Sequence, residues 1–349
     1  MKQMNVDNFR IHETEDEVAI SYYYGQDENV VVPAEIHGKP VTCIKEYAFY
    51  DQRTPLQFGF GRKFCVPIKS VCLPDTLKRM EAAFRDCDLL EEITIPAGVE
   101  YIDPDCFQCC YNLKAIHVSS QNPFFSEKNG ILYSKDGSIL VRCPQSHGCV
   151  DSSVLDGVTE IADSAFNACV NLHSISIPNT VKVINSSAFS NCPNLTEVSL
   201  HPDVALEGAV HFSCCKALRE IVFYNTKETL PRYCFYKCST LKAITFPTPI
   251  KVIEVGAFDD CGVQRIRIPE KNQKFLSNLP SDLIEIEIPK TVGIAAIRNI
   301  ISAAVHSNSM PQRKHEIRIL VESKSKAEKF CVENGYPCSH ICDTKNPTS

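Results

Sequence analysis

The stretch VTEIADSAFNACVNLHSISIPNTV at residues 158–181 contains one complete copy of the unit that decides the fold. Within it, Cys169 follows Phe166 by three residues and Leu172 follows it by six. The alternating segment ISIP comes next, at residues 175–178. Apolar residues at every second position are typical of a half-buried strand, and proline, which lacks an N–H, is best tolerated where a strand ends. The unit therefore predicts a short strand.

The same unit recurs along the chain with a period of 23 residues. Its phenylalanine returns at steps of 23, 59, 23, 23, 23 and 23 residues, as Phe84, Phe107, Phe166, Phe189, Phe212, Phe235 and Phe258. A cysteine follows each of them by three residues, as Cys87, Cys110, Cys169, Cys192, Cys215, Cys238 and Cys261. A unit of this size cannot cover its own apolar side. The units are therefore expected to stack, with parallel strands about 4.8 Å apart.

Stacking predicts one elongated domain with a strand and a brief helix in every unit. Eleven strands are expected, ending at Val32, Leu73, Ile95, Val118, Val154, Ile177, Leu200, Phe223, Phe246, Ile268 and Ile288. Ile161, Ala165 and Cys169 are spaced by four residues, which predicts a helix across residues 161–172. Asp163 is the expected N-cap of that helix.

These features resemble the BspA-like leucine-rich repeats, whose unit reads approximately I-x-x-x-A-F-x-x-C-x-x-L-x-x-I-x-I-P-x-x-V. Residues 158–181 and the segment VKVINSSAFSNCPNLTEVSL at 181–200 are close to that pattern. Residues 122–144 and 325–337 resemble the hairpin insert and the terminal cap of the family. The resemblance implies an α/β repeat fold: a leucine-rich-repeat solenoid with short parallel strands on the concave face, short helical turns on the convex face, and a cap at each end.

The predicted organisation has an N-terminal cap hairpin, repeats of about 23 residues, and a C-terminal cap with a tail, at residues 1–40, 41–290 and 291–349. The step from Val118 to Val154 is 36 residues, which indicates an insertion at 119–153. Alternating apolar residues on both sides of a Ser-Lys-Asp-Gly turn predict a projecting hairpin there. In the C-terminal part, residues 316–321 predict a strand and residues 324–334 a helix that Gly335 ends.

The charge balance excludes some classes of function. Lys and Arg number 36 against 42 Asp and Glu, a net charge of −6, whereas binding of nucleic acid requires a concentrated positive surface. Residues 1–17 contain no apolar run like that of a signal peptide, and no run of eighteen apolar residues could cross a bilayer. A cytoplasmic monomer is expected, with a secreted or cell-surface location as the alternative.

The 19 cysteines cannot all pair within one chain because their number is odd. The cysteine of each repeat is expected to be a buried, reduced thiol, and disulfides between neighbouring repeats in an oxidising compartment are the alternative. Three clusters contain residue types that bind zinc: Cys106, Cys109 and Cys110; Cys143, His147 and Cys149; and Cys331, Cys338, His340 and Cys342. No metal site is predicted, because the first cluster cannot easily form one tetrahedron and the last falls in a tail.

No arrangement of nucleophile, base and paired carboxylates is visible, so neither a catalytic residue nor a cofactor is predicted. Asp103 and Asp105 flank a proline at the start of a turn, where aspartate is ordinarily a cap.

The outward-pointing strand residues form the predicted binding face. They are Glu92, Thr94, His117, Ser174, Ser176, Glu197, Ser199, Glu220, Val222 and Thr245. Arg265 and Arg267 are expected to pair across strands with Glu285 and Glu287 instead of contacting a ligand. The carboxylates favour a basic or neutral protein surface as the partner.

The sequence thus predicts a non-catalytic protein-interaction scaffold of the BspA-like type, whose partner is an unidentified protein. An exported adhesin for host or microbial proteins or glycans is the alternative, since the resembled family is frequently described as surface-displayed. A third hypothesis is an enzyme that uses the hairpin at 119–153 as a lid, which would require a deep pocket beneath it.

Overall fold

The computed structural model describes most of the chain. The described residues are 6–50, 67–148, 154–248, 250, 252–267, 280, 283–295, 297–298, 300–302 and 317–341.

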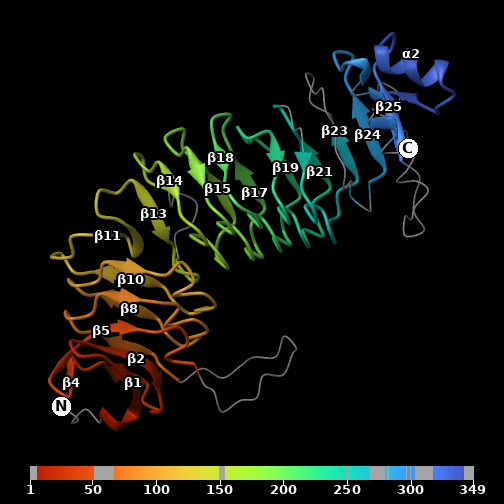
Figure 1. Cartoon of the computed structure of the whole chain (residues 1–349). Helices are drawn as coiled ribbons and strands as arrows, with labels where there is room; N and C mark the ends of the chain where they lie inside the picture. The colour runs from red at the N-terminus through yellow and green to blue at the C-terminus, as the bar shows by residue number, and fades with distance from the viewer. Residues whose placement is uncertain are drawn as a thin grey trace. The chain divides into compact units, whose positions relative to one another are not determined.

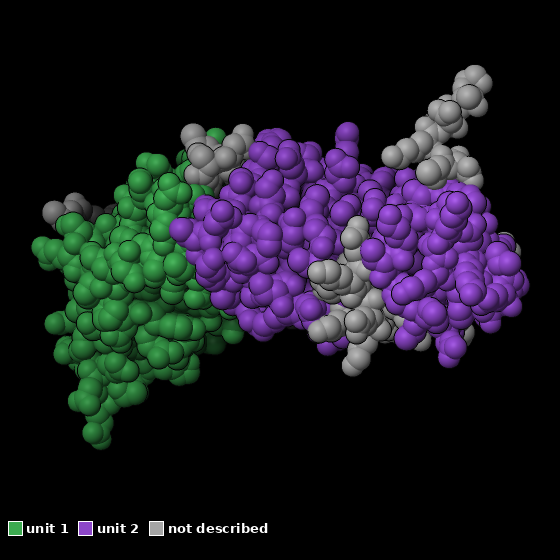
Figure 2. Space-filling model, turned by 90° about the horizontal axis from the view of Figure 1, so that it is seen from above, with its two compact units in different colours: residues 1–171 green, residues 172–349 purple. Residues whose placement is uncertain are grey.

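Contacts between residues divide the chain into two compact units, unit 1 with Met1–Asn171 and unit 2 with Leu172–Ser349 (Figure 2). That the whole chain forms one elongated domain stays a prediction. The strand expected to end at Val154 is not formed by the described residues. Val154 itself is a bend, and residues 149–153 lie outside the described part of the chain.

Unit 1 contains two series of parallel strands (Figure 1). The strands predicted from the repeat pair as β3 with β6 and as β8 with β10: β3 (Asn29–Val31), β6 (Ser70–Cys72), β8 (Glu92–Ile95) and β10 (Ala115–Val118). A second series joins β5, β7 and β9 to the N-terminal strands: β1 (Phe9–Glu13), β2 (Val18–Tyr23), β4 (Glu35–Ile36), β5 (Lys39–Ile44), β7 (Arg79–Met80) and β9 (Tyr101–Ile102). The 3-10 helix η1 (Val6–Asn8) precedes β1. The two-residue strands were not predicted.

Unit 2 has the same two series. The predicted strands form an eight-stranded parallel sheet in the described residues together with β26, which was not predicted: β15 (Ser174–Ser176), β17 (Glu197–Ser199), β19 (Glu220–Val222), β21 (Ala243–Thr245), β23 (Arg265–Arg267), β24 (Glu285–Ile288), β25 (Arg318–Val321) and β26 (Ser339–His340). The short strands are β16 (Val183–Ile184), β18 (Ala205–Leu206), β20 (Thr229–Leu230) and β22 (Val252–Ile253). In Figure 1 the strands from β15 to β24 follow one another side by side.

The repeat phenylalanines form a buried stack inside each unit. In unit 1 the ring centroids of Phe49 and Phe84 lie 4.9 Å apart, and those of Phe84 and Phe107 lie 6.1 Å apart. In unit 2 the rings of Phe189, Phe212, Phe235 and Phe258 stack with spacings of 5.6, 5.6 and 6.2 Å. Each repeat therefore buries its ring against the next repeat, and the predicted stacking is confirmed within each unit.

The helix predicted across residues 161–172 is wrong, because Ile161 belongs to a short strand and the residues after it form turns. Ser164 and Ala168, two residues before and after Phe166, have φ of 57° and 61°. An α-helix needs consecutive residues with negative φ, so two left-handed residues four apart exclude it. The regular repeats of unit 2 share this geometry, with left-handed residues at Ser187, Asn191, Val210, Cys214, Tyr233, Lys237, Gly256 and Asp260.

Hydrogen bonds between neighbouring repeats connect these turns. The amides of Ser187, Phe189 and Asn191 donate to carbonyls of the following repeat, on Ala209, His211 and Ser213, at 2.9, 3.0 and 2.7 Å. The amides around Phe212 donate in the same direction, to Arg232, Cys234 and Tyr236. The turns thus satisfy their backbone groups without a helix.

The predicted hairpin at 119–153 is present, but it does not simply project. It comprises β11 (Phe125–Lys128), β12 (Ile131–Ser134) and β13 (Ile139–Arg142), paired antiparallel in that order. Strand β13 then pairs in parallel with β14 (Glu160–Ile161). Buried Leu132 and Leu140 explain why the hairpin lies against the rest of the unit.

The insertion contains a degenerate repeat that the sequence analysis missed. The amide of Cys143 donates to the carbonyl of Ala165 at 2.7 Å, as the amide of Phe84 donates to that of Cys106 at 3.1 Å. Cys143 precedes Phe166 by 23 residues and therefore occupies the phenylalanine position. No phenylalanine marks the position, so the period was hidden.

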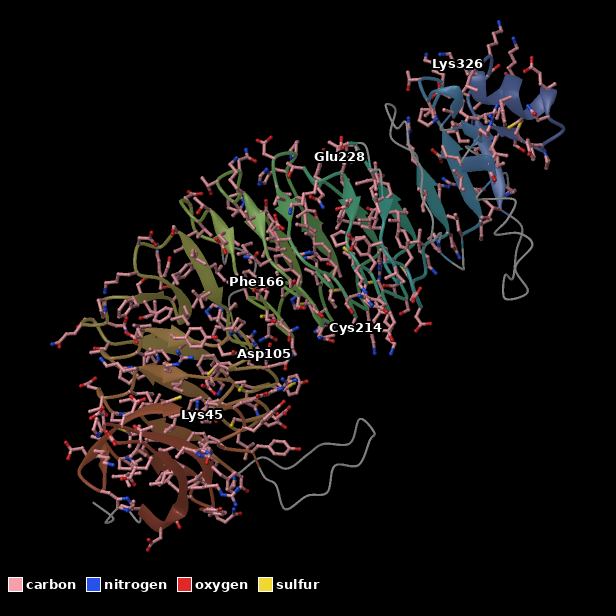
Figure 3. The ribbon with its side chains drawn as sticks, in the orientation of Figure 1. Lys45, Asp105, Phe166, Cys214, Glu228 and Lys326 are labelled. Atoms are coloured by element: carbon pink, nitrogen blue, oxygen red, sulfur yellow. The ribbon has the colours of Figure 1, made fainter. Side chains whose placement is uncertain are left out.

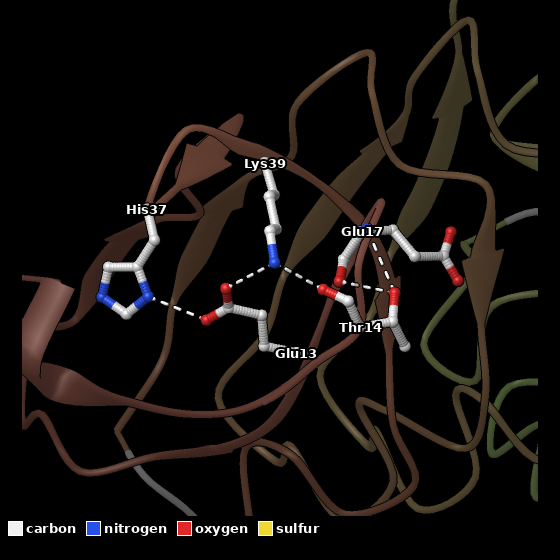
Figure 4. Close-up of polar contacts among 5 residues, drawn as sticks. All are labelled: Glu13, Thr14, Glu17, His37 and Lys39. Carbon is white, nitrogen blue, oxygen red and sulfur yellow. Dashed lines mark hydrogen bonds and ion pairs between the residues drawn. The ribbon is translucent and has the colours of Figure 1, made fainter.

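The N-terminal hairpin is formed by β1 and β2, which pair antiparallel. Side chains attach it to the β4–β5 turn: Glu13 accepts from His37 Nδ1 at 2.9 Å and from Lys39 Nζ at 2.8 Å (Figure 4). Lys39 Nζ also donates to the carbonyl of Thr14 at 2.6 Å. These contacts hold the hairpin against the first repeat. Its role as a cap stays a prediction.

The C-terminal strand and helix are confirmed. The helix α2 (Lys326–Glu333) begins after the N-cap Ser325, whose hydroxyl accepts from the amide of Glu328 at 3.0 Å, and it is followed by Gly335 with φ of 71°. Between β24 and β25, the described residues among 294–302 are helical.

Candidate functional site

The outer side of the eight-stranded sheet in unit 2 is exposed along β15 to β23. Alternate residues of each strand point inward and are buried, as Ile175, Val198, Ile221, Ile244 and Ile266. Their neighbours point outward and are exposed or half-buried. We call these outward residues the unit 2 sheet face: Ser174, Ser176, Glu197, Ser199, Glu220, Val222, Ala243, Thr245, Arg265 and Arg267.

The ten residues predicted to bind a partner do not share one sheet. Seven belong to the unit 2 sheet face, whereas Glu92, Thr94 and His117 lie in unit 1, on the two-stranded sheet of β8 and β10. There His117 Nε2 lies 3.4 Å from a carboxylate oxygen of Glu92. The sequence could not reveal this division, because the repeat residues look alike on both sides of the insertion.

Two carboxylates lie side by side in the middle of the unit 2 sheet face. Strands β17 and β19 pair in parallel with Ser199 opposite Val222, which places Glu197 beside Glu220 on the adjacent strand. Both glutamates are exposed, and neither forms an ion pair with any residue that the structure describes. Val222, next to them, leaves 47% of its surface exposed.

The charges at the β23 end of the face are paired. Arg265 lies 2.5 Å from a carboxylate oxygen of Glu285 and 3.7 Å from one of Glu287. Arg318 on β25 pairs with Glu285 from the other side. The predicted pairing of Arg265 across strands is therefore confirmed. Glu285 and Glu287 are 5% and 9% exposed, so the open part of the face ends at β23.

Unit 1 contains a polar depression of about 290 Å³ beside the short strands. Its lining residues are Glu46, Arg79, Glu81, Ala82, Tyr101, Asp103 and Asp105. The guanidinium of Arg79 lies over the ring of Tyr101 at 5.0 Å, and Lys45 pairs with Glu81 at 2.9 Å (Lys45 and Asp105 are labelled in Figure 3). Burial acts to raise the pKa of Glu81, but the bond from Lys45 keeps it below the ordinary value.

Asp103 has the capping role predicted for it, since its carboxylate accepts from the amide of Asp105 at 2.9 Å. Arg79 and Tyr101 were not among the predicted site residues. These two residues lie opposite each other on the paired strands β7 and β9. Their proximity could have been predicted only if the two-residue strands had been predicted as well. Among its lining residues the depression has no serine, cysteine or histidine as a nucleophile or base.

The cysteines of the repeats are buried, as predicted. The thiols of Cys110, Cys215 and Cys238 donate to carbonyls of Phe84, Phe189 and Phe212, in each preceding repeat, at 3.0, 3.1 and 3.0 Å. Burial raises the pKa of Cys238 well above its ordinary value. The thiol of Cys238 therefore stays protonated and supports packing instead of chemistry.

Within the described residues, no group of three or more His, Cys, Asp and Glu side chains could hold a metal ion. His147 Nε2 contacts the carbonyl of Asn129 at 2.7 Å, and His340 Nε2 lies 2.6 Å from a carboxylate oxygen of Glu328. Cys149 and Cys342, the other residues of these two clusters, lie outside the described residues. In the same part of the chain, no helix is both long and apolar enough to span a bilayer.

Comparison with known proteins agrees with this geometry. The sequence profile of the BspA type leucine rich repeat region matches six copies at residues 34–129 and 159–292. A leucine rich cell surface protein from Faecalibacterium prausnitzii has a similar structure, with 19% identity, a TM-score of 0.53, and coverage of 75% of this chain and 93% of that one. A leucine-rich repeat protein from Eubacterium ventriosum is similar with 20% identity, a TM-score of 0.59, and coverage of 85% and 77%.

A search of curated proteins finds no match. The two solved structures share the fold, and repeats of this kind are typical of protein-interaction and surface proteins. Together with the 23-residue period and the stacked phenylalanines, the profile match establishes the family. The chain belongs to the BspA-type leucine-rich repeat family.

Proposed function

We propose that this protein is a non-catalytic scaffold that binds a partner protein on the unit 2 sheet face. The observation that carries the proposal is the pair Glu197 and Glu220, exposed on adjacent strands without a cation from the described residues. Like charges on neighbouring strands destabilise a sheet. A lysine or arginine from a partner would relieve that repulsion.

The surroundings of the two glutamates suit a protein surface. Ser176, Ser199 and Thr245 have short side chains, so a broad partner can approach the strands. Val222 offers apolar area beside the charges, and interfaces commonly combine an apolar centre with a polar rim. The partner we propose therefore presents a basic patch with an apolar residue next to it.

The test compares two double variants with the same change in net charge. In E197K/E220K the acidic pair becomes basic, whereas the control E15K/E100K reverses two exposed glutamates in unit 1 that form no ion pair with the described residues. Tagged proteins are incubated with a lysate of the source cells, and captured proteins are quantified by mass spectrometry. We expect E197K/E220K to lose a partner that wild type and control retain. Equal capture by all three would refute binding at this face.

A second candidate is a surface-displayed protein that binds a host or microbial protein or glycan at the same face. It is supported by the similar structure from Faecalibacterium prausnitzii, which is described as a cell surface protein. Brief protease treatment of intact source cells, followed by immunoblotting, distinguishes the two. Degradation on intact cells supports display, while protection until lysis supports the cytoplasmic location predicted from the sequence.

The hypothesis of an enzyme with a hairpin lid receives no support from the geometry. Strand β13 of the hairpin is paired with β14, so opening it would break a parallel ladder. The described depression is lined by β7, β9 and adjoining turn residues and not by the hairpin.

A further inference from the structure

We propose that Cys331 and Cys338 form a redox-controlled disulfide that fastens helix α2 to strand β26. This inference is independent of partner binding. It assigns a modification site to the C-terminal end of unit 2, where the sheet of parallel strands stops.

The chain folds back onto Cys331 directly after α2. Cys331 lies in the last turn of the helix, and its side chain is fully buried. Gly335, with φ of 71°, reverses the chain, and the amide of Tyr336 donates to the carbonyl of Cys331 at 2.9 Å. The ring of Tyr336 also stacks on Phe330, with 6.2 Å between centroids. Two residues later the chain reaches Cys338, so both cysteines lie at the same turn.

The two thiols lie close enough to interact at this turn, because Cys338 adds to the effect of burial in raising the pKa of Cys331. Cys331 is buried, whereas Cys338 is half-buried and can meet a small reagent. The cysteines of the repeats differ in both respects: Cys215 and Cys238 are buried and donate to backbone carbonyls. Oxidation is therefore expected to select the C-terminal pair.

The bond would strengthen the end of the sheet at β26. Strand β26 has two residues and pairs with β25 through Ser339 and His340. An edge strand this short has few backbone bonds to hold it. A link from Cys338 to the buried Cys331 would tie the strand to α2, and a short covalent loop restricts the unfolded segment.

The oxidant that we name is a small disulfide such as oxidised glutathione. The thiolate of Cys338 attacks it, forming a mixed disulfide and releasing one glutathione thiolate. The thiolate of Cys331 then attacks the sulfur of Cys338 and releases the second glutathione. Two electrons pass from the cysteine sulfurs to glutathione, and the two thiol protons end on the released thiolates. Burial, with the nearby Cys338, raises the pKa of Cys331, so the second step should accelerate as pH rises.

The experiment incubates the full chain in glutathione buffers of stepped redox ratio at pH 8. Free thiols are then alkylated and the peptides are analysed by mass spectrometry. We expect a linked pair of peptides containing Cys331 and Cys338, two mass units lighter than the free thiols, with Cys215 and Cys238 still alkylated. Limited proteolysis of residues 326–341 should slow at least threefold after oxidation and recover on reduction.

Three variants make the result decisive. C338S should show neither the link nor the protection, and C331S should accumulate a glutathione adduct on Cys338. C214S, which removes another half-buried thiol, should behave like wild type. The proposal is overturned if wild type stops at the glutathione adduct, if Cys338 links to a different cysteine, or if oxidation leaves the proteolysis rate unchanged.

Discussion

His211 occupies a position that holds a small residue in the neighbouring repeats. It directly precedes Phe212, where Ala188, Cys234 and Ala257 precede the other phenylalanines of unit 2. Its side chain is fully buried, and neither ring nitrogen has a hydrogen-bond partner of normal length among the described residues. Burial lowers the pKa of His211 to about 4, partly offset by the backbone of Asn185 and the charge of Glu207.

This histidine should make unit 2 sensitive to acid. The unfolded chain binds the proton with the ordinary pKa of 6.5, whereas the folded chain binds it only near 4. The full contribution to stability is therefore present above pH 6.5 and is lost as pH falls toward 4. The shift corresponds to about 3 kcal/mol. We predict that H211A loses less unfolding free energy than wild type between pH 7 and 4, by roughly this amount, in urea titrations monitored by circular dichroism.

The comparison uses the change of unfolding free energy with pH in H211A and wild type. The cavity left by the imidazole ring lowers the stability of H211A equally at every pH, so it does not affect this change. The exposed His173 provides the control, and H173A should follow the wild-type pH dependence. If H211A and wild type lose stability in parallel on acidification, His211 is not the group that titrates.

At the scale of the element, Arg142 completes the degenerate repeat of the insertion. In the regular repeats a cysteine thiol donates to the carbonyl of the preceding phenylalanine, as Cys110 does to Phe84. The carbonyl of Phe107 instead accepts from Arg142 Nη2 at 3.1 Å, and Arg142 Nη1 donates to the carbonyl of Ser164. Arg142 is 2% exposed, so these bonds satisfy buried groups. One guanidinium thus bridges the turns on both sides of the insertion.

Replacing this guanidinium should loosen the insertion. In R142M the carbonyls of Phe107 and Ser164 keep an amide donor each but lose their bonds to a charged group, which is expected to cost about 2–4 kcal/mol of unfolding free energy. Lysine has no planar fork with which to reach both carbonyls, so R142K should rescue less than half of the loss. Urea unfolding measures the change, and hydrogen exchange should locate it at residues 139–167. The exposed Arg219 supplies the control: an R219M variant as unstable as R142M would contradict the bridging role.

The strands were predictable from sequence because their determinants are local. Alternation such as Ile175 and Ile177 specifies a half-buried strand, and the period specifies the stacking. The turns were not predictable in the same way. Their left-handed residues include Ala168 and Val210, and alanine and valine rarely adopt a positive φ. The spacing of the apolar residues therefore suggested a helix. The degenerate repeat escaped because Cys143 replaces the phenylalanine that marks the register.

The residues of the candidate site were predictable, but their arrangement was not. The alternation of apolar and polar residues identified Glu197 and Glu220 as outward residues, and the family pattern identified the sheet. Neither pattern could show that Glu92 lies on another sheet, because that depends on how the insertion interrupts the strands. The pairing of Arg265 with Glu285 was predictable because both residues hold the same register on consecutive strands.

At the scale of the molecule, the chain consists of two compact units, each with its own phenylalanine stack. Phe84 and Phe212 are equivalent rings, both fully buried and each stacked between two others. Repeat proteins transmit stability chiefly between nearest neighbours. Damage to one stack should therefore remain within its unit.

The matched variants F84A and F212A test this expectation. Each should lose about 3–5 kcal/mol of local stability, the usual cost of removing a buried ring. Native-state hydrogen exchange should show lost protection mainly in residues 67–118 for F84A and in residues 183–258 for F212A. Uniform loss of protection along the chain in both variants would show that the two units unfold as one.

The turn amides that donate to the following repeat, such as those of Phe189 and Phe212, have a consequence for the evolution of the gene. Deletion or duplication of 23 codons leaves each of these amides opposite an equivalent carbonyl. A change of 22 or 24 codons shifts the register of the hydrogen bonds between neighbouring repeats. Recombination between neighbouring repeats can therefore add or remove whole repeats without creating a new kind of contact between them. The number of repeats can in this way change one at a time.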